Sequence, residues 1–82
     1  MNLKDTIEMM TSTDYKERFK AEYCQLEIRL KGLKAMLEKW DKGSLAFTPT
    51  STRETYDKQL QAMIDYISVL EIRAYEEGIE LW

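Results

Sequence analysis

The chain has 82 residues, of which 44% are hydrophobic and 33% are charged, and its formal net charge is −3. This length suits one domain over residues 1–82, and the charge does not favour a duplex nucleic acid as a partner. With no histidine and one cysteine, the chain lacks the usual nucleophile–histidine pairs and zinc ligands. We therefore expect no enzyme activity, no metal and no cofactor.

The same composition bears on location. No apolar run approaches the roughly 20 residues needed to span a bilayer, so we expect no membrane partner. The N-terminus lacks the basic start and apolar stretch of a secretory signal. A single cysteine cannot form an internal disulfide and suits a reducing compartment. We expect a cytoplasmic protein.

The N-terminal segment should form a short helix over residues 2–10, with three apolar side chains on one face. Four polar residues at 11–14 interrupt it. Asp14 followed by Glu17 is typical of a capping box, which places the start of a long helix near residue 15. The apolar residues of the short helix are Leu3, Ile7 and Met10.

The first long helix should span about 15–41, because apolar residues recur there at alternating steps of four and three. Residues three and four apart share one helix face, and a seven-residue repeat favours coiled-coil-like packing. Gly43 is suited to the left-handed position that ends a helix. The apolar residues of this seam are Phe19, Tyr23, Leu26, Leu30, Leu33, Leu37 and Trp40.

The second long helix should span 52–77, after a connection in which Pro49 prevents continuous helix. Ser51 with Glu54 indicates a second capping box, and Gly78 should end the helix. Leu45 and Phe47 in the connection should plug the end of the hairpin. The second seam is Tyr56, Leu60, Met63, Ile67, Leu70 and Ala74.

Two helices of nearly equal length predict an all-α fold, an antiparallel hairpin of two long helices with the short N-terminal helix. In this arrangement Phe19 should lie toward Ala74, and Trp40 toward Tyr56. Residues 79–82 should form a tail, in which Trp82 could pack or anchor a partner.

A row of mostly small residues flanks the first seam and predicts an oligomer. Glycine inside a helix costs about 1 kcal/mol relative to alanine, so Gly32 suggests close approach of another helix, although a tolerated glycine is the alternative. A lone hairpin would also bury little apolar surface, and we expect a homo-oligomer. The predicted interface is Ala21, Cys24, Ile28, Gly32 and Ala35.

The starts of the two long helices each gather cations and hydroxyl groups where exposed backbone N–H groups favour anions. An aromatic face, a guanidinium and hydroxyl donors together suit a nucleobase and its phosphate. The alternative is a core tyrosine, a helix cap and solvated cations. The candidate ligand-binding residues are Tyr15, Lys16, Arg18, Thr50, Ser51 and Arg53.

Four short segments suggest a family. They are DYKERF at 14–19, FTPT at 47–50, QLQAM at 59–63 and RAYEEGI at 73–79. In this order and spacing they resemble a family of small proteins encoded by crAss-like and other gut-bacterial phages. Members often have a cysteine soon after FTPT, where this chain has Ser51 and Thr52, which argues against thiol chemistry there.

The resemblance implies a phage protein acting in the cytoplasm of a host bacterium. Its architecture is similar to that of the helical-hairpin sponges with which phages capture cyclic oligonucleotide signals of CBASS and Thoeris immunity. We therefore expect a non-enzymatic sponge for cyclic di- or trinucleotides, formed by copies of this chain. The alternatives are a protein–protein inhibitor such as an anti-CRISPR, and a phage structural or assembly factor.

Overall fold

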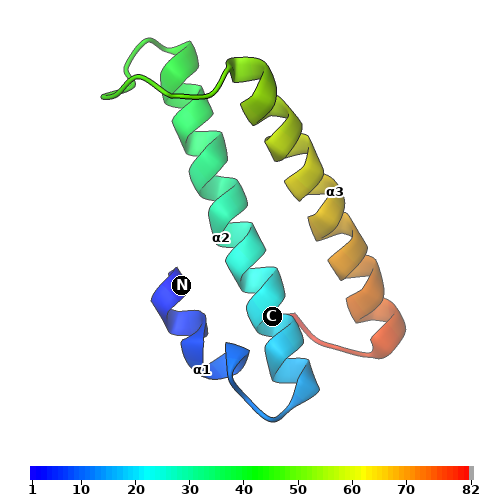
Figure 1. Cartoon of the computed structure of the whole chain (residues 1–82). Helices are drawn as coiled ribbons and strands as arrows, with labels where there is room; N and C mark the ends of the chain where they lie inside the picture. Colours follow the sequence, from blue (N-terminus) through cyan, green and yellow to red (C-terminus); the bar gives the residue numbers. More distant parts are fainter. Residues whose placement is uncertain (82) are drawn as a thin grey trace.

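A computed structural model describes residues 1–81, and these residues form helices and connections with no strand. A 3-10 turn η1 (Leu3–Thr6) leads into the short helix α1 (Ile7–Met10). The long helices α2 (Tyr15–Asp41) and α3 (Arg53–Glu77) follow. Figure 1 shows α2 and α3 running antiparallel, with α1 beside the first half of α2. The predicted all-α class is confirmed.

Side chains in the preceding turns set the start of each long helix. The Asp14 carboxylate accepts a hydrogen bond from the backbone N–H of Lys16 at 3.0 Å, as an N-cap should. The backbone N–H of Asp14 donates to the Ser12 hydroxyl at 3.0 Å, in the role predicted for Glu17. The predicted Ser51 cap of α3 is wrong by one residue. Thr52 caps this helix instead, because its hydroxyl reaches the N–H of Thr55 at 3.2 Å.

Both long helices end at a glycine in the left-handed region, as predicted. Gly43 has φ of 70° and Gly78 has φ of 69°, a conformation that costs glycine little. The N–H groups of Ser44 and Ile79, one residue further on, donate to carbonyls in the last helical turn at 2.9 and 2.8 Å. The chain therefore turns sharply at both points.

A core cluster lies where α2 begins and α3 ends. After the turn at Gly78 the tail folds back, so that Ile79 is buried against both helices, with Leu81 packed beside it. Leu70 is 0% exposed. Trp82 lies outside the described residues. The buried members of this cluster are Phe19, Tyr23, Leu70, Ala74 and Ile79.

The other end of the hairpin, beside the connection, is closed by aromatic contact. Trp40 and Tyr56 meet edge to face with ring centroids 6.0 Å apart. This pair, and the clustering of Phe19 with Ala74, confirm the predicted pairing of the helices. The predicted plug is wrong for Phe47, which is 56% exposed.

The N-terminal segment is buried most completely at a threonine of η1, whereas Leu3, Ile7 and Met10 of the predicted apolar face are exposed. Thr6 is 0% exposed, and its hydroxyl donates to the Leu3 carbonyl at 2.7 Å and accepts from the Gln25 amide at 2.9 Å. Ala21, on the α2 face beside Gln25, is 1% exposed within the single chain. The chain itself therefore buries Ala21, which needs no second copy to cover it.

Tyr23 gives the fold a dependence on alkaline pH. Burial, followed by the nearby charges of Glu71 and Glu27, raises the pKa of Tyr23 from 10.0 to about 12. The raised pKa means that the neutral phenol stabilises the fold fully below pH 10. This contribution is lost as pH rises from about 10 to about 12, since the unfolded chain ionises first.

We expect Tyr23→Phe to remove the highest step from an absorbance titration of the tyrosines. The same variant should flatten the fall in unfolding free energy across this pH range. Tyr75→Phe is the matched control, because Tyr75 is 90% exposed, and it should leave that step in place. A wild-type titration without a step near pH 12 would contradict the burial of Tyr23.

Candidate functional site at the closed end of the hairpin

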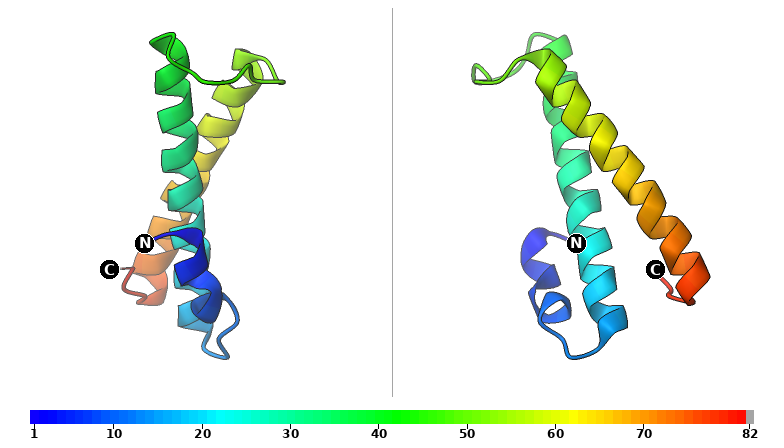
Figure 2. Two further views of the ribbon diagram at one scale, coloured as in Figure 1. Left: turned by 90° about the vertical axis from the view of Figure 1, so that its left-hand side faces the viewer. Right: turned by 45° about the vertical axis from the view of Figure 1, so that its right-hand side comes forward.

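The six predicted ligand-binding residues fall into two groups at opposite ends of the molecule. The starts of α2 and α3 lie at opposite ends of the antiparallel pair, along a molecule 43 Å long (Figures 1 and 2). One chain therefore cannot bring all six residues to a single ligand. We call the end beside the connection the closed end of the hairpin and the opposite end the open end. The group at the open end is Tyr15, Lys16 and Arg18, and the group at the closed end is Thr50, Ser51 and Arg53.

At the open end, Tyr15 ties the start of α2 to the end of α3. Its hydroxyl donates to Glu77 at 2.5 Å and accepts from Arg73 at 2.9 Å. The guanidinium of Arg73 also lies 4.9 Å from the centre of the Phe19 ring. The bond to Glu77 raises the pKa of Tyr15, and the same bond, together with Arg73, lowers the pKa of Glu77. Tyr15 thus makes interhelical contacts.

The two cations of this group lie on the surface nearby. The Arg18 guanidinium donates to the Ser12 carbonyl at 2.9 Å and so braces the turn that precedes α2. Lys16 is exposed, and its backbone N–H is the one capped by Asp14. The contacts of Tyr15 and Arg18 within the chain indicate that this end has a structural role.

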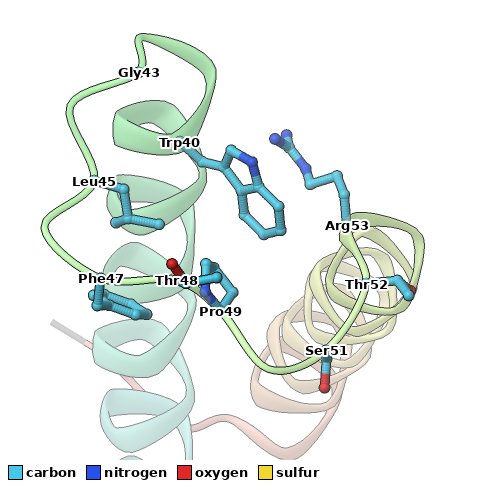
Figure 3. A pocket seen from close by; sticks show the side chains of 9 residues that line it. All are labelled: Trp40, Gly43, Leu45, Phe47, Thr48, Pro49, Ser51, Thr52 and Arg53. Carbon is cyan, nitrogen blue, oxygen red and sulfur yellow. The ribbon is translucent and has the colours of Figure 1, made fainter.

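At the closed end, the connection and the two helix ends border a shallow, open hollow of about 340 Å³. Figure 3 shows the indole of Trp40 and the side chain of Arg53 reaching toward each other from α2 and α3, with Pro49 between the helices. Thr50 does not line the hollow, although its neighbours do. The lining residues are Trp40, Gly43, Leu45, Phe47, Thr48, Pro49, Ser51, Thr52 and Arg53.

Arg53 is the charged group of this hollow, and three neighbours position it. Its guanidinium carbon lies 5.6 Å from the centre of the Trp40 ring, within cation–π range. Its Nε donates to Asp57 at 2.9 Å, and its two terminal nitrogens donate to Asp41, one of them at 3.2 Å. The Arg53 hydrogen bonds hold the pKa of Asp41 below its usual range.

The lining combines features that suit a flat, anionic ligand. Trp40 and Phe47 offer aromatic faces for stacking, Thr48 and Ser51 offer hydroxyls, and Arg53 offers a planar cation. Of the predicted residues, Ser51 and Arg53 line the hollow. The sequence interpretation did not assign Trp40 and Phe47 to it, although the predicted hairpin already placed Trp40 opposite the start of α3.

A second hollow of about 370 Å³ lies beside the C-terminal tail. Two carboxylates, Glu71 and Glu80, line it together with apolar side chains and Tyr75, and its lining contains no cation. This lining does not suit an anion. Residues 1–81 also contain no group of three or more Cys, Asp or Glu that could hold a metal ion. None of the helices in residues 1–81 combines the length and the apolar character that a membrane span requires.

The arrangement defines a small helical-hairpin protein with a ligand-sized hollow at its closed end. A family model described as Sequestin matches residues 13–76, and the chain belongs to this family. The match covers α2, the connection and all of α3 but its last residue, so it includes every residue of the closed-end hollow. The family name suggests a sequestering role, which is one of binding rather than of catalysis. Searches of curated proteins and of solved structures each found no match.

Proposed function

We propose that this protein is a phage-encoded sponge that binds cyclic oligonucleotide immune signals and holds them away from their receptors. The observation that carries this proposal is the placement of the Arg53 guanidinium against Trp40 at the edge of a hollow. The match to the Sequestin family supports a sequestering role. The resemblance of four segments to gut-phage proteins supports a phage origin.

The chemistry of the closed-end hollow matches the two parts of a cyclic oligonucleotide. A phosphodiester presents two non-bridging oxygens, which the fork of Arg53 can bind side by side. A nucleobase presents a flat face, which Trp40 or Phe47 can stack against, and such stacking is worth about 1–3 kcal/mol. Ser51 and Thr52 both line the hollow, and Thr52 also caps α3.

We propose further that copies of the chain associate. The middle of the seam is only half-buried, as at Leu33, because in a pair of helices the facing helix covers a side chain from one side only. An apolar row on α3 is also exposed beside the seam, including Ile72 at 59% and Tyr75 at 90%. Of the predicted interface, Gly32 and Ala35 are exposed, and Cys24 and Ile28 are half-buried. Association would cover these groups, since burial of apolar area stabilises a complex.

The variant Gly32→Ala distinguishes a lone hairpin from an assembly that packs through the Gly32 face of α2. A Cβ at Gly32 meets nothing within 4 Å in the single chain. In a monomer the change should therefore stabilise α2 by about 1 kcal/mol. If Gly32 lies against another copy, as we propose, the added methyl group should instead shift sedimentation toward the monomer. The matched control is Ala62→Gly. Ala62 is exposed on α3, so this change should alter helix propensity alone.

Calorimetry with a panel of cyclic di- and trinucleotides tests the proposed function. We expect one class of ligand to bind saturably, with matched linear dinucleotides as controls for charge. A ligand at 100 times its dissociation constant adds about 2.7 kcal/mol to stability, so thermal shift should agree. Absence of heat across the panel, together with capture of one host protein on an affinity column, would favour the inhibitor alternative instead.

A further inference from the structure

The guanidinium of Arg53 is already occupied at the edge that a ligand would need. Its Nε bonds to Asp57, which lies four residues further along the same helix. Its outer edge, formed by the two terminal nitrogens, bonds to both carboxylate oxygens of Asp41. The two carboxylates therefore hold different sides of one planar cation, and only Asp41 belongs to the other helix.

The carboxylate of Asp41 has the shape and charge of the ligand group that we expect there. Two oxygens on one atom, facing the paired nitrogens of an arginine, form the same fork that a phosphodiester forms. Asp41 follows directly after Trp40 in the last turn of α2, so it lies beside the ring that the guanidinium covers. A phosphate could therefore bind the two terminal nitrogens of Arg53 only after the Asp41 carboxylate had left them.

The exposure of the pair makes exchange feasible. The Asp41 side chain is 62% exposed and that of Arg53 is 34% exposed, so water reaches both partners. Exposed ion pairs contribute little stability, and one can be replaced by another without opening the core. Asp57 can keep the guanidinium in place during such an exchange, because its bond to Nε does not involve the outer edge.

We propose that Asp41 is an internal competitor for the ligand, occupying the outer edge of Arg53 until a phosphate displaces it. This inference rests on the proposed function in one respect, namely that the ligand carries a phosphate. Asp41 then determines specificity. A weak monoanion does not displace the carboxylate, whereas a ligand that also stacks in the hollow does. In this role Asp41 acts through Arg53.

Titration with inorganic pyrophosphate, followed by NMR at the side-chain Nε–H of Arg53, tests this role without a known ligand. We expect Asp41→Asn to bind pyrophosphate about 3- to 10-fold more tightly than the wild type, because a competitor and a like charge are removed. Asp57→Asn is the charge-matched control and should gain less than about 2-fold, because the outer edge stays occupied. Asp41→Ser also removes the carboxylate but adds no amide that could perturb the turn. We expect it to bind pyrophosphate as tightly as Asp41→Asn does.

Three results would overturn the role of Asp41. They are equal gains in the two asparagine variants, a gain that persists when Arg53→Gln is added to Asp41→Asn, and an Arg53 signal that does not respond to pyrophosphate. Failure of the proposed function would look different. In that case Asp41→Asn would still gain affinity for pyrophosphate through Arg53, while no cyclic nucleotide bound to any variant.

Discussion

Leu70→Ala should lower the free energy of unfolding by about 2–5 kcal/mol, the usual cost of truncating a fully buried leucine. Leu70 is 0% exposed and lies in the cluster that joins α2, α3 and the folded-back tail. A cavity there would loosen three segments at once, since Ile79 packs in the same cluster. Urea denaturation followed by circular dichroism measures the effect.

The matched control is Leu33→Ala, the same change in the middle of the first seam. Leu33 is half-buried, so its loss should cost about 1–2 kcal/mol. Sequence periodicity places both leucines at equivalent seam positions. They differ in burial, because the tail also covers Leu70, whereas only the facing helix covers Leu33. Equal costs at Leu70 and Leu33 would show that the middle of the seam is covered as well, as another copy of the chain would cover it.

Arg53→Gln should weaken binding of the cyclic oligonucleotide about 10- to 100-fold, because a charge-assisted contact is worth about 1.5–3 kcal/mol. The glutamine keeps hydrogen-bonding capacity but loses the planar cation that lies over Trp40. Arg53→Lys should recover only part of the affinity, since an ammonium group cannot form the two-nitrogen fork. Calorimetry with the ligand selected from the panel measures both variants.

Arg18→Gln is the control for charge at the other end of the molecule. It removes the same charge, but Arg18 braces the turn before α2, and the start of α2 lies at the end opposite the connection (Figure 1). We expect its effect on ligand affinity to be less than about 2-fold, the size of a distant exposed charge. A loss as large as that of Arg53→Gln would show instead that the ligand contacts both ends, which requires two copies of the chain.

The sequence predicted the helices and their pairing well, because these depend on local signals. The seven-residue repeat gave the seams, and the two glycines gave the ends of the long helices. It failed where several hydroxyls competed for one role, as at Ser51 and Thr52, since a cap depends on which side chain reaches the helix backbone. It also did not indicate the burial of Thr6, whose hydroxyl bonds to Gln25 in a distant part of the chain.

The site was predicted only in part for a similar reason. Hydroxyls and cations at a helix start are visible in the sequence, and two of the residues predicted in this way, Arg53 and Ser51, line the hollow. The sequence does not show that Arg18 and Arg53 lie at opposite ends until the antiparallel pairing is applied to them. Nor does it show that Asp41 bonds to Arg53, because this contact forms across the connection between the helices.

Recovery of the ligand from the complex tests sequestration most directly. The protein would be mixed in excess with the cyclic nucleotide that binds in the panel, the free pool measured after filtration, and the complex then denatured by heat. We predict that the free nucleotide disappears on mixing and returns intact and quantitatively on heating, and that Arg53→Gln leaves most of it free. Recovery of a linearised or hydrolysed product, or no loss from the free pool, would contradict the account.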